Sequence, residues 1–287
     1  MKSLLPIAVL LMMISIGMTL QPGEVLRNWR RTTAGAWLRL LIATFLIPPL
    51  IVLLLARVLP IEPSALVGLF MVSVAPGAPL LTRNIAKRGF DMHLAASYQV
   101  WGAVLTPIML PLTVAAAGKL YNHNVWISPL LLLREIAEKQ FVPLLAGIAL
   151  MYALPEIGRR LQPVFNAFGN ATLAFVIVLF LIKMWPELRQ MSGWVFVVAV
   201  ALGVGSLAAV MLLLSDRPRE AATLALSNTN RHVGLALLLS GQYLHNRFAL
   251  PSVASYALLA PLLMFLFSMW AHKYVISDTS AFTQKAA

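Results

Sequence analysis

Six consecutive polar residues interrupt an otherwise apolar stretch, residues 218–244, and their side chains are the ones best suited to chemistry. They are Ser227, Asn228, Thr229, Asn230, Arg231 and His232. The guanidinium of Arg231 stays protonated and presents five donors that suit a carboxylate, a sulfonate or a phosphate. Asparagine and threonine weaken a helix by offering side-chain hydrogen bonds to its backbone. The pattern predicts a broken helix at which Arg231 either binds an anion or only caps the carbonyl groups freed by the break.

A second interruption lies in another apolar stretch, residues 64–88. Its middle reads Ala75-Pro76-Gly77-Ala78-Pro79. Each proline removes a backbone donor and disfavours helical angles in the residue before it. Free backbone groups are costly in hydrocarbon, so such a break is expected to line a cavity or to be buried in protein. We assign Pro76, Gly77 and Pro79 to this break and Thr229 to the other.

The two interrupted stretches also resemble each other. Thr82-Arg83-Asn84 matches Asn230-Arg231-His232, a polar residue, an arginine and a polar residue, about half a chain length away. Paired interrupted helices in the two halves of a chain are the best sequence pointer to the central binding site of a transporter. Thr82, Arg83 and Asn84 therefore join Ser227, Asn228, Asn230, Arg231 and His232 as candidate substrate-binding residues.

The residues of the two interrupted stretches do not indicate an enzyme. Neither interruption, 75–79 or 227–232, contains a carboxylate, and the chain has no cysteine. An intramembrane enzyme would need a carboxylate pair, a nucleophile with a base, or metal ligands at depth. We therefore expect a protein that is not an enzyme and that has no metal or cofactor site.

The composition predicts the class of protein in which these residues lie. Of the 287 residues, 60% are hydrophobic and 11% are charged, against about 45–50% and about 25% in soluble domains. The chain is therefore expected to be an all-α polytopic membrane protein, a single integral domain over residues 1–287. The apolar segments are 3–20, 33–59, 64–88, 91–117, 129–154, 163–185, 193–215, 218–244 and 249–275, which predicts about nine transmembrane helices.

The basic residues predict how the chain sits in the bilayer. The formal net charge is +12, but the charges fall mostly in short connections between apolar segments, so a nucleic-acid partner is not expected. Lysine and arginine prefer the cytoplasmic side, which places the N-terminus outside and the C-terminus in the cytoplasm of a bacterial inner membrane.

One charged stretch is interpreted as structural. Arg134 and Glu138, and likewise Glu135 and Lys139, stand four residues apart at the start of segment 129–154. Residues at this spacing pair along one side of a helix. We expect two ion pairs there, and no catalytic carboxylates.

Several motifs give the chain a resemblance to a known family. They are Met13-Ile-Ser-Ile-Gly-Met-Thr-Leu20, Val74-Ala-Pro-Gly-Ala78, Gly89-Phe-Asp91, Leu105-Thr-Pro107 and Val233-Gly-Leu-Ala236. With them the chain resembles the bile acid:sodium symporter family. The resemblance implies a secondary transporter of small organic anions that works by alternating access, with a core moving against a panel. It also implies two inverted repeats, 1–117 without its first helix and 129–275, which give four plus five helices and two broken helices that cross in the core.

The chain departs from the family at the positions that bind sodium. A Ser-Asn pair of the family is Leu81 and Thr82 here, while its Glu, Gln and Asn are Ser227, Arg231 and His232. Gln99 is a further polar neighbour of the site in the family arrangement. The hypothesis is that Arg231, together with Arg83, is a built-in cation that replaces sodium, so that transport is independent of sodium or coupled to protons through His232. The alternative is a conventional sodium-coupled symporter of a bile acid-like anion.

Overall fold

The structure, a computed structural model, describes residues 4–19, 23, 33–77, 85–120, 128–243 and 247–276. Its described elements are all helices, as the composition predicts. Six helices are long and apolar enough to cross a membrane, namely Ala34–Val58, Met92–Lys119, Leu130–Ala153, Pro155–Lys183, Gly193–Leu213 and Ala249–Ile276. In the other three predicted segments the described residues form no helix of that length. Residues 4–19 form a helix of 16 residues, and segments 64–88 and 218–244 are interrupted where the sequence predicts it.

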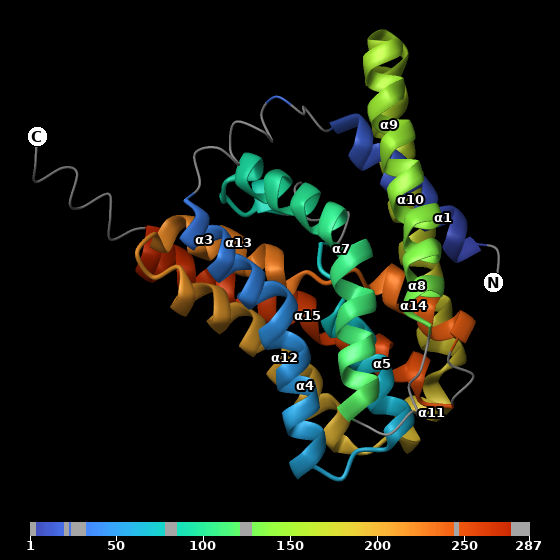
Figure 1. The fold of residues 1–287 in the computed structure, drawn as a ribbon, viewed down its shortest axis with the longest axis vertical. Helices are drawn as coiled ribbons and strands as arrows, with labels where there is room; N and C mark the ends of the chain where they lie inside the picture. Colours follow the sequence, from blue (N-terminus) through green and yellow to red (C-terminus); the bar gives the residue numbers. More distant parts are fainter. Residues whose placement is uncertain are drawn as a thin grey trace, which may run out of the picture.

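Three helices at one side of the molecule pack against one another and form what we call the panel (Figure 1). They are α1 (Leu4–Thr19), the span made of α8 (Pro129–Ile136), the π-helix η2 (Ala137–Phe141) and α9 (Val142–Ala153), and α10 (Pro155–Lys183). Glycines bring α1 and α9 into backbone contact. A Cβ on Gly147 would lie 2.1 Å from the carbonyl oxygen of Ile14, and one on Gly17 would lie 2.1 Å from that of Leu144.

The panel should therefore be sensitive to a single methyl group at Gly147. Gly147→Ala is expected to lower the free energy of unfolding by about 1–3 kcal/mol or more, because the backbone of α1 must move away. Denaturation of the purified protein in detergent measures this loss. Gly193→Ala is the matched control, since a Cβ there meets nothing within 4 Å. Equal stability of the two variants would contradict the close contact.

The remaining helices form a second body, which we call the core. Its first span joins α3 (Ala34–Leu41), the π-helix η1 (Ile42–Leu46) and α4 (Ile47–Val58). The others are α5 (Pro63–Ser73), α7 (Met92–Leu120), α12 (Gly193–Leu213), α13 (Pro218–Thr229), α14 (Val233–Tyr243) and α15 (Ala249–Ala271), which continues as the π-helix η3 (His272–Ile276). The short helix α11 (Trp185–Gln190) connects α10 to the core. Panel and core meet most extensively where α8 and η2 contact α7, and they meet again where α1 contacts α14 and α10 contacts α15.

One predicted boundary is wrong. The sequence places the start of the sixth segment at residue 163, whereas α10 begins at Pro155. Only one residue separates it from the end of α9 at Ala153. Pro155 occupies the first turn of α10, where a missing N–H is harmless and the fixed φ angle favours a helix. Arg159 and Arg160 suggested a loop, but they lie within the first turns of this helix.

The ion pairs predicted at the start of the fifth segment are confirmed. Arg134 Nε lies 2.7 Å from Glu138 Oε1, and Lys139 pairs with Glu135. Both pairs join residues four apart on one helix, which is why the spacing alone was sufficient to predict them.

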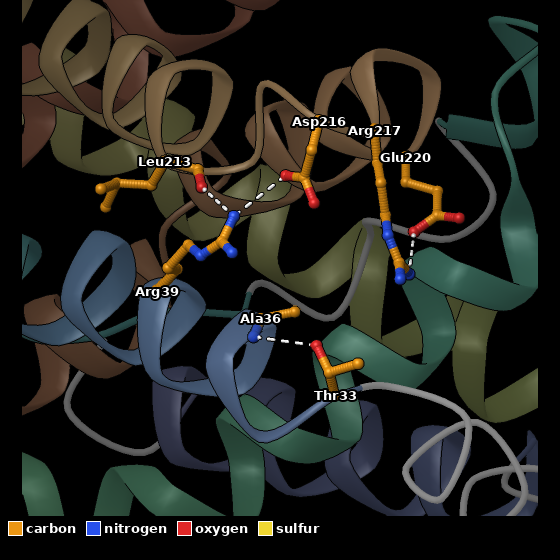
Figure 2. Close-up of polar contacts among 7 residues, drawn as sticks. All are labelled: Thr33, Ala36, Arg39, Leu213, Asp216, Arg217 and Glu220. Atoms are coloured by element: carbon orange, nitrogen blue, oxygen red, sulfur yellow. Dashed lines mark hydrogen bonds and ion pairs between the residues drawn. The ribbon is translucent and has the colours of Figure 1, made fainter.

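Polar contacts join the last turn of α3 to the connection from α12 to α13 (Figure 2). Arg39 Nη1 donates to the Leu213 carbonyl at 3.2 Å and lies 3.0 Å from Asp216 Oδ1. Arg217 pairs with Glu220 at the first turn of α13. Exposed pairs of this kind contribute little stability, about 0–1 kcal/mol each. Arg39 thereby joins α3 to the connection that leads into α13, whose other end lies at the second helix break.

Candidate binding site at the helix breaks

Two helix breaks meet inside the core. The helix α5 ends at Ser73, and residues 75–77 have no regular structure. Gly77 adopts a φ of 77°, a left-handed conformation that glycine takes readily. On the other side, α13 ends at Thr229 and α14 begins at Val233. The backbone N–H of His232 donates to the carbonyl of Ala75 at 2.8 Å, so the two breaks predicted from the sequence touch each other.

Arg231 is buried at this contact, with 1% of its surface exposed. Its Nη1 donates to the carbonyl oxygens of Thr44 at 3.1 Å and Ser73 at 3.2 Å. Its Nη2 donates to Ser206 Oγ at 3.3 Å and Asn228 Oδ1 at 3.2 Å. We call these four oxygen atoms the guanidinium cage. The cage contains no carboxylate, and Ser73 is the last residue of α5, where the helix dipole places partial negative charge.

Two carbonyl groups of η1 lack a backbone donor because two prolines follow the π-helix. In this π-helix the N–H of Ile47 donates to the carbonyl of Ile42, one residue further back than in an α-helix. The next two residues, Pro48 and Pro49, have no N–H to offer. The carbonyls of Ala43 and Thr44 therefore accept from the side chains of Asn228 and Arg231 instead. Arg231 caps carbonyls freed by helix irregularities, as one of the two interpretations of the sequence predicts.

Asn228 uses all its hydrogen-bonding capacity within the core. Its Nδ2 donates to the carbonyls of Ala43 at 3.1 Å and Ser206 at 3.0 Å. Its Oδ1 accepts from Tyr98 Oη at 3.0 Å and from Arg231. Asn228 thus aligns the guanidinium and has no group left for a ligand.

Two more of the predicted residues bond within the core. Ser227 Oγ donates to the carbonyl of Thr223 at 2.8 Å, within its own helix. Thr229 Oγ1 donates to the carbonyl of Ala225 at 3.0 Å, and the Thr229 carbonyl accepts from Tyr256 Oη at 2.6 Å. All of these side chains are buried.

A cavity of about 200 Å³ lies between panel and core beside the breaks. Three candidate residues line it, namely Asn230, Arg231 and His232. Leu173 and Ile177 of α10 form the wall on the panel side. The other lining residues are Arg88, Val233, Gly234, Tyr256, Ala257, Ala260, Pro261 and Met264. The lining contains arginine and histidine but no acidic residue among those described.

His232 presents an unpartnered donor at this cavity. Its Nδ1 accepts from the backbone N–H of Leu235 at 3.0 Å, so the neutral imidazole carries its proton on Nε2. The side chain is 1% exposed, and Nε2 has no hydrogen-bond partner in the described part of the chain. His232 also precedes the first turn of α14, where the helix dipole is positive, although the N–H groups of Val233 and Leu235 are already bonded to the Arg231 carbonyl and to His232 Nδ1. This end of the cavity is suited to an anionic group.

The other predicted residues lie elsewhere. Thr82, Arg83, Asn84 and Pro79 fall outside the described residues. Gln99 is buried on α7, and its backbone carbonyl oxygen would lie 3.8 Å from a Cβ on Gly77. Gln99 therefore borders the first break.

Sequence reasoning missed Thr44, Ser206, Tyr256 and Arg88 as residues of the site. Pro48 and Pro49 were the signal for Thr44, because a proline pair inside an apolar segment frees carbonyl groups that need donors. Ser206 and Tyr256 carry no such signal, since apolar helices often contain single hydroxyl groups.

Comparison with known protein families gives a match. The sequence pattern of the Sodium Bile acid symporter family matches residues 6–190, which include the first break and the panel helices. No curated protein matches the chain.

Proposed function

The chain belongs to the Sodium Bile acid symporter family, and from this premise we propose that it carries a small organic anion across the membrane as a secondary transporter. Members of the family are membrane transporters, so the apolar helices are those of an integral membrane protein. The observation that carries the proposal is the cavity between panel and core, which ends at the unpartnered Nε2 of His232.

On this proposal the anionic group binds at the first turn of α14. The Nε2–H of His232 donates to it, and the positive end of the α14 dipole adds partial positive charge. Arg231 lies directly behind them and adds a full positive charge, and its Nε has no partner among the described residues. Asn230 lines the same end of the cavity and offers an amide.

Movement of the core against the panel would then expose the cavity to either side in turn. The hydrogen bond between His232 and Ala75 supports a pair of repeats, 1–117 and 129–275, whose broken helices cross at the site. The basic residues favour an N-terminus outside and a C-terminus in the cytoplasm.

We also propose that transport does not require sodium. A sodium ion would need oxygen ligands, and the four oxygens of the guanidinium cage already hold a cation that cannot leave. Family membership favours the competing proposal, a conventional sodium-coupled symporter in which other carbonyl, asparagine or threonine oxygens bind the ion.

Replacement of sodium separates the two proposals. With the protein in liposomes, uptake of a radiolabelled organic anion is expected to stay the same when external Na⁺ is replaced by K⁺ or choline. The reason is that Arg231 already provides the positive charge that a sodium ion would otherwise supply to the anion. A strict sodium requirement would contradict sodium independence and favour the conventional symporter.

A further inference from the structure

Arg88 places a second cation at the same cavity. Its guanidinium lines the cavity with His232 and Arg231. Nη1 donates to Ser268 Oγ at 2.9 Å and to the Met264 carbonyl at 3.4 Å. No carboxylate lies within ion-pair distance of Arg88 in the described part of the chain, and Nε and Nη2 make no hydrogen bond there. At least two donors of this guanidinium therefore remain for a ligand.

The helix α15 shows that the two charged ends of the cavity are well separated. Tyr256 reaches the break end, where its hydroxyl donates to the carbonyl of Thr229. Met264 and Ser268 contact Arg88 at the other end. Tyr256 and Met264 lie about 12 Å apart along the helix axis, at a rise of about 1.5 Å per residue. The distance suits a short molecule that carries charge at both of its ends.

Between these ends the cavity is apolar and narrow. Its side walls are formed by Leu173, Ile177, Ala257 and Ala260. The volume of about 200 Å³ is below the roughly 300–1,000 Å³ of pockets that bind drug-sized ligands. A short aliphatic chain fits these walls, whereas a steroid skeleton does not fit this volume.

We propose that the substrate is a small molecule with two separated acid groups. One acid binds His232 and the first turn of α14, and the other binds the free donors of Arg88, with an aliphatic chain between them. The inference rests on the proposed function, because it assigns a substrate class to the same cavity.

The test compares acids with one and two charged ends. The probes are α,ω-dicarboxylates from succinate to suberate and the monocarboxylates of the same chain lengths. Binding to the purified full-length protein in detergent is measured by titration calorimetry. We expect one dicarboxylate length to bind at least tenfold more tightly than its monocarboxylate, because only that length reaches both ends.

Three variants test whether the second acid group binds to Arg88. Arg88→Gln should lower the affinity for the dicarboxylate to about that for the monocarboxylate. Lys87→Gln is the matched control, since Lys87 is the exposed neighbouring cation and does not line the cavity. Ser268→Ala removes a partner of Arg88 but keeps its guanidinium, so the preference for the dicarboxylate should persist.

The outcomes separate this inference from the proposed function. Monocarboxylates that bind as tightly as dicarboxylates at every length would overturn the inference and leave the anion site at His232 standing. Failure of every acid to bind the wild-type protein would count against both. The comparison of chain lengths uses the wild-type protein alone, so it decides the question even if Arg88→Gln does not fold.

Discussion

Replacing Arg231 by methionine is expected to abolish transport and to lower the free energy of unfolding by more than about 3 kcal/mol. Methionine has a similar length but no donor, so the four oxygens of the guanidinium cage lose their partner. Each buried acceptor left without a donor costs about 1–3 kcal/mol. Denaturation in mixed micelles measures the stability, and uptake into liposomes measures the transport.

Arg231→Lys is the matched variant. It keeps the positive charge, but an ammonium offers three donors from a single nitrogen, where the guanidinium divides its donors between separate nitrogens. The stability of this variant should lie between that of the wild-type protein and that of Arg231→Met. A methionine variant as stable as the wild-type protein would show that the cage does not depend on the guanidinium.

The second large effect is expected at His232. His232→Phe keeps a ring of similar size but removes the donor Nε2–H and the acceptor Nδ1. The affinity for an organic anion should fall by about 10- to 150-fold, which corresponds to the roughly 1.5–3 kcal/mol of a hydrogen bond to a charged group. Loss of the contact from the Leu235 N–H to Nδ1 should also lower stability by about 1 kcal/mol, as for other helix caps.

Ser240→Ala is the control for this variant. Ser240 lies on α14, the helix that His232 precedes, is fully buried, and its Oγ has no partner among the described residues, but it does not line the cavity. Its removal should leave anion affinity unchanged, as measured by titration calorimetry. Equal affinities of the His232→Phe and wild-type proteins would place the anion elsewhere.

The sequence was sufficient for features that depend on neighbours along the chain. Pro76 and Gly77 predicted the first break, because proline and glycine act on their own backbone. The run from Ser227 to His232 predicted the second break for the same kind of local reason. The ion pairs of Arg134 and Glu135 were equally local.

The direction in which each polar side chain points could not be predicted in this way. Asn228 and Asn230 look equivalent in the sequence, yet Asn228 bonds Tyr98 and Ser206 whereas Asn230 lines the cavity. That difference depends on α7 and α12, which are distant along the chain. Arg88 was likewise not recognised as a site residue, because only the fold brings α15 beside it.

The guanidinium cage also determines which charges cross the membrane. Arg231 is bonded to four oxygens of the protein, so it returns with the core after every cycle and makes no net contribution to the charge transported. Without an accompanying sodium ion, the proposed cycle moves only the charge of the anion itself. Each elementary charge exchanges about 2.3 kcal/mol with a membrane potential of 100 mV. In a cell with a negative interior, a built-in cation therefore leaves the anion driven outward by the potential, and an anion with two charges is driven about twice as strongly.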